Sequence, residues 1–380
     1  MNFDTSLKDT FEGGRLFEHN GVKILDLHGG WKQMGRQYGY LAADMIKDVC
    51  RNFLRSKITA ENEAAIWQMT EDLYHLYPYR LKQVFAGMLE TSGLTMNELK
   101  LANAAEYTAA VYGCSAMAAW NDYASGNLIY GRNYDGPGFQ PLCHDIVVVV
   151  YHPSDGSLAT ATVGYAGEIY AVNAFNEKGL FVELNNGMPS AGTDIDFSRF
   201  AGTTELLTMM MDADSMEYVD GFFKTVKGFA SFTIGVADEY EARSYEWCAQ
   251  GMARGDGSTP DGLMAMTNHY VSPTWEFPVP DDDHSWISIQ RRNNLLSQAA
   301  THKGHLDAPT MCQIMQTYIP DGGPRHEFTL YQLVFEPATM KLWMQITEVN
   351  EWEEIELGKL FGIENGERRI EELRCEDVKM

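Results

Sequence analysis

The sequence lacks the features that place a protein in a membrane or on a secretory route. No apolar run approaches the length of about 20 residues that a helix needs to cross a bilayer. The first residues, MNFDTSLKDTFEGG, are polar and contain no apolar signal-peptide core. We therefore expect a cytoplasmic protein without membrane contact, or a periplasmic or secreted one if a signal peptide has been removed.

Closely spaced cysteines and phosphate-binding loops are also missing. No two cysteines form a CxxC pair, and no GxGxxG or GK[ST] motif occurs. These absences argue against a zinc ribbon, a redox pair and a nucleotide-binding loop. We expect free thiols, no metal and no cofactor. The six cysteines are Cys50, Cys114, Cys143, Cys248, Cys312 and Cys375.

Basic residues are few relative to acidic ones. The chain has 29 Lys and Arg against 53 Asp and Glu, a formal net charge of −24. This charge repels nucleic acids and anionic membranes, so neither is an expected partner. Its length of 380 residues and its hydrophobic fraction of 45% suffice for one large domain or two ordinary ones. A homo-oligomer is compatible with the sequence.

Apolar spacing predicts helices in the first hundred residues and mainly strands afterwards. The helical pattern follows a strand at 22–28, covers 31–54 and 62–101, and breaks near Pro78 and Ser92. The strands predicted after residue 113 are 127–133, 145–153, 157–164, 179–185, 229–238, 241–247, 328–337 and 341–347, and the helices are 203–226, 285–300 and 308–317. This segregated order favours two sheets with helices outside them over a regular βαβ alternation. The tail after Glu348 is expected to add a surface helix or strand.

Cys114 opens a stretch of small residues followed by a polar turn and a strand that ends in GRNYD. A hairpin here brings Arg132 and Asp135 back beside Cys114. A guanidinium favours the thiolate, which is the reactive form of cysteine, and a carboxylate can hold an amine. Taken alone, the pattern favours a buried core cysteine and a surface ion pair.

Four separated segments change this interpretation. Together they resemble the penicillin-acyltransferase family (isopenicillin N acyltransferase-like, peptidase C45-type) of N-terminal nucleophile hydrolases. More distantly, they are similar to choloylglycine and penicillin V hydrolases. The segments are LHGGWKQMGRQYGYLAADM (27–45), YGCSAM with YGRNYD (112–135), FNEKGLFVELNNG (175–187) with MTNHYVSP (266–273), and HEFTLYQLVFEPATMKLWM (326–344).

The resemblance implies an α+β fold, a four-layer αββα sandwich with an N-terminal helical pro-segment. Residues 1–113 would form the pro-segment and residues 114–380 the catalytic domain. Cys114 would cut the Gly113–Cys114 bond, and 1–113 would stay bound as a subunit. The α-amine released at Cys114 would then act as the general base, so that no histidine is needed.

Site roles carry over from the same resemblance. Cys114 matches the nucleophile, Arg132 the arginine that stabilises the thiolate, and Asp135 the aspartate that fixes the amine. Asn268 matches one oxyanion donor, which stabilises charge that appears only in the tetrahedral intermediate. For the second donor, the spacing within NEKGLFVELNNG favours Asn186, while the preceding Leu favours Asn185; we choose Asn186 and keep Asn185 in reserve.

Two further residues are expected near the substrate. A late family arginine follows a serine by three positions, and Ser288–Arg291 has this spacing, although a solvated helix face explains it equally well. His269 lies beside Asn268 and is expected to be structural or to line the substrate site.

The expected activity is hydrolysis or transfer of the acyl group of a linear amide through a thioester. Small-molecule substrates of this class are an N-acyl amino acid, an N-acyl amine, a peptide-like amide or a β-lactam side chain. A bile-salt or penicillin V hydrolase is an alternative, although those relatives carry the cysteine at the very start. A binding protein on the same scaffold that never processes itself is another.

Overall fold

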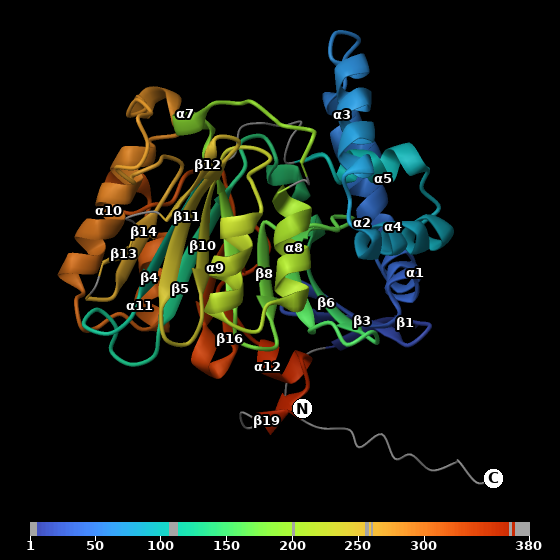
Figure 1. Ribbon diagram of the computed structural model, residues 1–380. Coiled ribbons are helices and arrows are strands. Elements are labelled where there is room, and N and C mark those ends of the chain that lie inside the picture. Colours follow the sequence, from blue (N-terminus) through green and yellow to red (C-terminus); the bar gives the residue numbers. More distant parts are fainter. Residues whose placement is uncertain are drawn as a thin grey trace.

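The computed structural model describes residues 6–105, 113–199, 202–254, 258–259, 261–364 and 367–368. Two large sheets pack face to face, and helices cover their outer faces (Figure 1). Cys375 and the end of the C-terminal tail lie outside the described residues. The five described cysteines, which are Cys50, Cys114, Cys143, Cys248 and Cys312, are all buried free thiols, as the sequence predicts.

Among the described residues, the larger sheet has ten strands, and all neighbouring pairs are antiparallel except β3 and β6, which are parallel. In spatial order they are β1 (Ser6–Phe11), β2 (Gly14–His19), β3 (Val22–Gly29), β6 (Ile146–Pro153), β7 (Thr160–Tyr165), β8 (Asn173–Asn176), β9 (Phe181–Asn186), β10 (Phe232–Ala237), β11 (Ala242–Cys248) and β12 (Gly251–Arg254).

The smaller sheet, in the part of the chain that the structure describes, has seven strands and contains the Cys114 hairpin at its centre. In spatial order they are β13 (Ser258–Thr259), β14 (Leu263–Met266), β4 (Cys114–Ala119), β5 (Ile129–Asp135), β15 (Thr329–Glu336), β16 (Lys341–Ile346) and β17 (Glu353–Glu356). A separate hairpin pairs β18 (Ile363–Glu364) with β19 (Glu367–Arg368).

Helices cover both outer faces. The α-helices are α1 (Trp31–Leu41), α2 (Ala43–Lys47), α3 (Glu63–His75), α4 (Tyr79–Thr91), α5 (Met96–Ala102), α7 (Met188–Ala191), α8 (Gly202–Asp212), α9 (Met216–Thr225), α10 (Ser288–Thr301), α11 (Ala308–Gln316) and α12 (Leu357–Leu360). Short π or 3₁₀ turns are η1 (Asp48–Phe53), η2 (Leu54–Lys57), η3 (Gln140–Asp145), η4 (Asp282–His284), η5 (Ile319–Asp321) and η6 (Pro337–Thr339). Helices α1 and α8 lie on the larger sheet, while α10 and α11 lie on the smaller one.

Side-chain alternation along the strands separates three apolar cores. Ala116 and Ala118 of β4 face the core between the two sheets, while Met117 and Ala119 face α10 and α11. A third core joins the outer face of the larger sheet to its helices. Because successive side chains of a strand point to opposite faces of its sheet, each sheet has an apolar surface on both faces. The result is four layers, helix, sheet, sheet and helix, as the resemblance implied.

The N-terminal region differs from the expected helical pro-segment because it also supplies three strands. β1 and β2 form a hairpin whose turn residues Glu12 and Gly13 have φ values of 48° and 91°. Positive φ at both turn positions is typical of a type I′ hairpin. All β1 residues except Phe11 are exposed. The segment therefore lacks the alternation of apolar and polar residues that would predict a strand from the sequence. β3 then pairs with β6, which makes this region continuous with the larger sheet.

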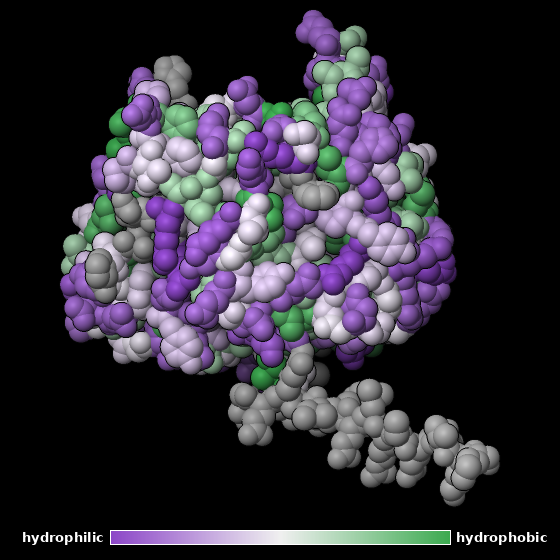
Figure 2. Space-filling model, in the orientation of Figure 1, coloured by the Kyte–Doolittle hydropathy of each residue, from purple (hydrophilic) through white to green (hydrophobic). Residues whose placement is uncertain are grey.

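Hydrophilic side chains dominate the face of the molecule shown in Figure 2, with apolar residues scattered among them. This agrees with the large excess of acidic residues. Within the described residues, no helix combines the length and the apolar character needed to cross a bilayer.

Candidate active site

The site is centred on Cys114, the first residue of β4. The β4–β5 hairpin pairs Cys114 with Tyr134 and Ala116 with Arg132, as the sequence predicts. Cys114 is buried in the core between the sheets, with its side chain 1% exposed. Local β-propensity alone would not bury a reactive group here; β5 pairs with Cys114 on one side, and Asn268, which follows β14, contacts it on the other.

Arg132 lies beside the thiol and is completely buried. Its Nη2 is 3.7 Å from Cys114 Sγ and donates to the Leu184 carbonyl at 2.8 Å. Its Nη1 donates to Asn185 Oδ1 at 2.8 Å and forms an ion pair with the buried Glu183. The sequence analysis missed Glu183, although it precedes Asn185 by two on the same strand face. The carboxylate compensates the buried guanidinium, which leaves the arginine able to stabilise a thiolate.

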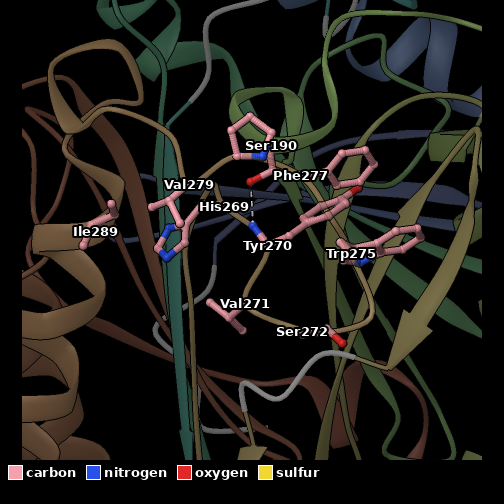
Figure 3. A pocket seen from close by; sticks show the side chains of 10 residues that line it. Ser190, His269, Tyr270, Val271, Ser272, Trp275, Phe277, Val279 and Ile289 are labelled. Atoms are coloured by element: carbon pink, nitrogen blue, oxygen red, sulfur yellow. Dashed lines mark hydrogen bonds between the residues drawn. The ribbon is translucent and has the colours of Figure 1, made fainter.

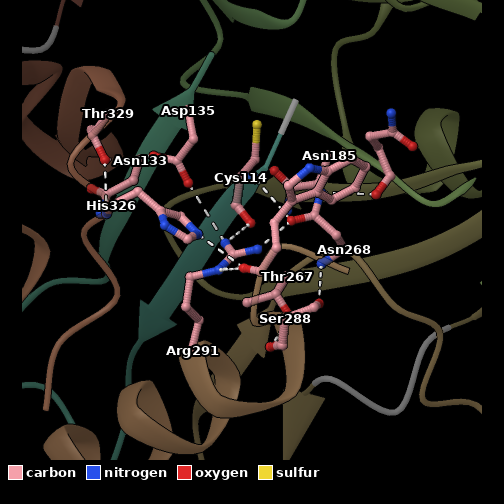
Figure 4. Close-up of polar contacts among 12 residues, drawn as sticks. Cys114, Asn133, Asp135, Asn185, Thr267, Asn268, Ser288, Arg291, His326 and Thr329 are labelled. Atoms are coloured by element: carbon pink, nitrogen blue, oxygen red, sulfur yellow. Dashed lines mark hydrogen bonds and ion pairs between the residues drawn. The ribbon is translucent and has the colours of Figure 1, made fainter. Parts of the chain in front are cut away.

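The Gly113–Cys114 peptide bond is held on both sides. The Gly113 carbonyl accepts a hydrogen bond from the Asp135 backbone N–H at 2.9 Å. The Cys114 N–H donates to Asn268 Oδ1, also at 2.9 Å. The Cys114 carbonyl accepts from Arg291 Nη1 at 2.6 Å. These contacts fix the peptide immediately next to the thiol (Figure 4).

Arg291 belongs to the site rather than to a solvated helix face. It lies in the first turn of α10, is completely buried, and donates to Asn268 Oδ1 at 2.6 Å. The two residues that immediately precede α10, Trp286 and Ile287, both have a positive φ, 54° and 55°. Such a conformation is rare for bulky or β-branched residues and is found where the surroundings enforce it. The Trp286 carbonyl accepts from Arg291 Nε at 2.9 Å.

Asp135 lies at the end of β5, on the same side of Cys114 as Arg291 (Figure 4). Its Oδ1 accepts from the Thr329 hydroxyl at 2.6 Å, and Arg291 Nη1 is 3.7 Å from Oδ2. No hydrogen-bond donor among the described residues reaches Oδ2. Burial raises the pKa of Asp135, and nearby positive charges offset only part of that rise. The carboxyl group can therefore accept an additional cationic donor.

Asn185 and Asn186 point in opposite directions because they are neighbours on strand β9. The Asn185 side chain faces Arg132 and is completely buried. The Asn186 side chain turns away, and its Oδ1 accepts from the Met188 backbone N–H at 2.8 Å. Of the two residues, the reserve choice, Asn185, therefore presents its side chain to the Cys114 cluster. Asn186 contributes its backbone carbonyl, which accepts from Asn268 Nδ2 at 2.9 Å.

Asn268 is positioned by a buried hydroxyl. Its backbone N–H donates to Ser288 Oγ at 2.8 Å, and Ser288 also contacts Thr267 and His269. The amide oxygen of Asn268, rather than its NH₂ group, faces Cys114. In this uncleaved chain Asn268 therefore holds the nitrogen of the nucleophile, and the expected oxyanion donation remains a prediction.

The histidines near the site are engaged in other contacts. Nδ1 of His269 lies 2.7 Å from Ser288 Oγ, and burial lowers the pKa of His269 to about 4. His326, which the sequence analysis did not single out, has Nε2 2.9 Å from the Trp286 carbonyl. His144 lies on η3 and is exposed. None of these contacts links a histidine ring to the Cys114 thiol.

His269, the residue that follows Asn268, lines a cavity of about 340 Å³ (Figure 3). Tyr270, Trp275 and Phe277 form one wall, and the Trp275 and Phe277 rings stack with centroids 5.3 Å apart. Val271, Val279 and Ile289 add aliphatic surface, while His269 and Ser190 supply polar groups. The lining suits an apolar or aromatic group that carries a polar end.

A protein-family profile matches the part of the chain that follows Cys114. Residues 123–351 match the profile of the family described as acyl-coenzyme A:6-aminopenicillanic acid acyl-transferase. The match includes Arg132, Asp135, Asn268 and Arg291. No curated protein sequence matches the chain.

Three kinds of solved structure have low similarity to this chain. An N-acylethanolamine-hydrolyzing acid amidase ortholog from Caenorhabditis elegans is 16% identical over 59% of this chain and 93% of that chain, with a TM-score of 0.44. A mutant conjugated bile acid hydrolase from Clostridium perfringens is 12% identical over 66% and 95%, with a TM-score of 0.42. Penicillin V acylase from Agrobacterium tumefaciens is 10% identical over 65% and 78%, with a TM-score of 0.38. At these values the likeness transfers no substrate and no residue role.

Proposed function

Because the chain belongs to the acyl-coenzyme A:6-aminopenicillanic acid acyl-transferase family, we propose that it is a self-processing cysteine enzyme. It hydrolyses or transfers the acyl group of a linear amide. The observation that carries this proposal is the set of contacts around the Gly113–Cys114 bond. Arg132 lies against the thiol, Asp135 binds the preceding carbonyl, and Asn268 binds the Cys114 nitrogen.

These contacts support the following course of self-cleavage. The Cys114 sulfur attacks the Gly113 carbonyl carbon, and the Asp135 backbone N–H stabilises the developing negative charge on the oxygen. The carbon–nitrogen bond breaks, the thiol proton passes to the released nitrogen, and a thioester links Gly113 to Cys114. Water then cleaves the thioester and leaves a Gly113 carboxylate and a free Cys114 thiol.

Cleavage also prepares the catalytic base. The new α-amine of Cys114 has an unperturbed pKa of about 7.7–8.0, close to working pH. Asp135 Oδ2, which has no hydrogen-bond donor among the described residues, can accept from its ammonium form. Asn268 Oδ1 already binds this nitrogen in the uncleaved chain. The amine can therefore take the proton of its own thiol without a histidine.

During turnover, the thiolate attacks the amide carbonyl of the substrate and forms an acyl-enzyme. We assign oxyanion stabilisation to Asn185, whose Nδ2 makes only a long contact of 3.4 Å with Glu183. The leaving amine departs, and water or a second amine resolves the thioester. The aromatic cavity beside Asn268 accepts the apolar part of an N-acyl amine, N-acyl amino acid, peptide-like amide or β-lactam side chain.

The thiol is buried in the uncleaved chain, and Gly113 lies against the Trp286 side chain. A Cβ added to Gly113 would be 3.2 Å from Trp286 Cβ. Substrate therefore reaches Cys114 only after Gly113 has moved away from it. On this proposal, cleavage both creates the base and opens the site.

Mass spectrometry of the denatured protein tests the proposal. We expect the wild type to give two chains, one of which begins at Cys114. Cys114→Ala should remain a single chain of 42.8 kDa, because it has no sulfur nucleophile. Cys312→Ala, which alters another buried free thiol, is the matched control and should process normally. Cleavage of Cys114→Ala at the same bond would exclude self-processing, and a full-length, inactive wild type would favour a binding protein.

A further inference from the structure

Asp26, His28 and His152 form a compact group far from Cys114 in sequence and outside its contacts. β3 and β6 run parallel and place His28 directly opposite His152, and the two rings stack with centroids 4.3 Å apart. Both Nε2 atoms lie 2.9 Å from Asp26 Oδ1. The two strands lie next to each other at the base of the helical lobe (Figure 1).

The three side chains converge on one point. Asp26 has 2% of its surface exposed, whereas the His28 side chain is 41% exposed, so the group is anchored inside and open to solvent on one side. The ligand atoms, two imidazole nitrogens and one carboxylate oxygen, all lie within 4.8 Å of one another. Tetrahedral ligands at about 2.0–2.1 Å from a zinc ion are about 3.3 Å apart. The two histidine–carboxylate separations of 2.9 Å are those of hydrogen bonds, so an ion would replace the shared protons and widen these separations by a few tenths of an ångström.

Arg15 supports the carboxylate from its other side. Its Nε donates to Asp26 Oδ2 at 2.9 Å, so that Oδ1 is left to face the histidines. A ligating carboxylate that is itself oriented by a hydrogen bond from a second side chain is typical of metal sites in proteins.

We propose that Asp26, His28 and His152 bind one divalent transition-metal ion, for which Zn²⁺ is the reference. Two imidazoles and one carboxylate suit Zn²⁺, Ni²⁺ or Cu²⁺, and they disfavour Mg²⁺, which prefers oxygen ligands. Sequence spacing does not predict this site, because His152 is separated from Asp26 and His28 by more than one hundred residues.

The position of the ligands gives the ion a role that rests on the proposed self-cleavage. Asp26 and His28 precede the Gly113–Cys114 bond, and His152 follows it. A bound ion therefore links the two chains that cleavage produces. It joins them at the one parallel strand pair of the larger sheet, β3 and β6.

Calorimetric titration of the chelator-treated full chain with Zn²⁺ tests the site. We expect one Zn²⁺ per chain, at least tenfold weaker binding in His152→Ala, and no binding of Mg²⁺. His28→Ala, at a partly exposed position, gives the same test if His152→Ala fails to fold. His305→Ala, an exposed histidine elsewhere, is the control and should bind like the wild type. Absence of Zn²⁺ binding, or equal binding in all variants, would leave only a hydrogen-bonded His–Asp–His group.

The linking role is tested separately from self-cleavage. Zn²⁺ binding should persist in the uncleaved Cys114→Ala variant, whether or not the wild type processes itself. In processed wild type, removing the ion with a chelator should lower the urea concentration at which the two chains separate, and His152→Ala should abolish that difference. An unchanged urea concentration would overturn the linking role alone.

Discussion

At the residue scale, the two adjacent asparagines of β9 provide a matched comparison. Asn185 faces Arg132 and the thiol, whereas Asn186 faces Met188. We expect Asn185→Ala to lower kcat by about 10²–10³-fold, because it removes a donor for the oxyanion. Asn186→Ala keeps its backbone carbonyl and should change kcat by only a few-fold. Steady-state kinetics of the processed proteins measures both.

The melting temperature of each variant is measured as well, because Asn185 also accepts a hydrogen bond from the buried Arg132 and its loss could destabilise the fold. A fall in kcat of the expected size with a melting temperature within a few degrees of the wild type supports the catalytic role. A large loss of kcat in Asn186→Ala with little in Asn185→Ala would reverse the assignment. Asn268→Ala belongs to the same series and should impair processing as well as turnover, because it holds the Cys114 nitrogen.

His269 makes stability depend on pH. Burial lowers its pKa to about 4, while the unfolded chain has the ordinary value of 6.5. Below pH 6.5 the unfolded state therefore binds a proton that the folded state rejects, and stability falls as the pH approaches 4. Between pH 7 and pH 5 the free energy of unfolding should drop by about 2 kcal/mol more in the wild type than in His269→Asn. Urea titrations at both pH values measure the difference, and His305→Asn, at an exposed position, should follow the wild type.

At the scale of secondary-structure elements, η1 and η3 bring two carboxyl groups together. Asp145 of η3 is buried close to Asp48 of η1, and burial together with this like charge raises the pKa of Asp145 to about 7. The folded state therefore binds a proton that the unfolded state has released, and stability is lost as the pH rises from about 4 to about 7. Elements on opposite sides of the Gly113–Cys114 bond thus repel each other more at alkaline pH.

Replacing Asp145 removes this repulsion. Asp145→Asn should resist urea better than the wild type at pH 8, by up to about 3 kcal/mol relative to pH 5, where the two proteins should converge. Asp48→Asn should give a smaller gain at pH 8 than Asp145→Asn, because it removes the like charge but leaves the burial of Asp145, which is the larger cause of its raised pKa. An equal stability difference at both pH values would mean that packing, and not the shared charge, separates the variants.

At the scale of the whole molecule, residues before Gly113 and residues after it share one sheet. β3 pairs with β6 from Lys23 to Gly29, and α1 packs on β3. Removing the N-terminal segment would expose the edge of β6 and an apolar core. We therefore expect both fragments of the processed protein to elute together in gel filtration. An active, monodisperse 114–380 fragment would contradict this expectation.

The sequence by itself determined the type and approximate limits of most of the longer elements, although it did not predict the strands β1, β2 and β14, and predicted β4 only as one arm of the Cys114 hairpin. The helices at α3, α4 and α5 and the breaks near Pro78 and Ser92 follow from local periodicity and from residues that end helices. The Cys114 hairpin likewise follows from a polar turn between two apolar stretches. Such signals depend on neighbours a few positions away in the chain, and these neighbours are visible in the sequence.

Contacts between distant segments decided the rest. The exposed strand β1 has no apolar periodicity and is defined by its pairing with β2. The choice between Asn185 and Asn186 depends on which face of β9 meets Arg132, and a shift of one residue would exchange them. The burial of Arg291 and the meeting of Asp26 with His152 depend on packing and parallel pairing. Local propensity specifies the elements, but only tertiary structure specifies which face each element buries and what it meets there.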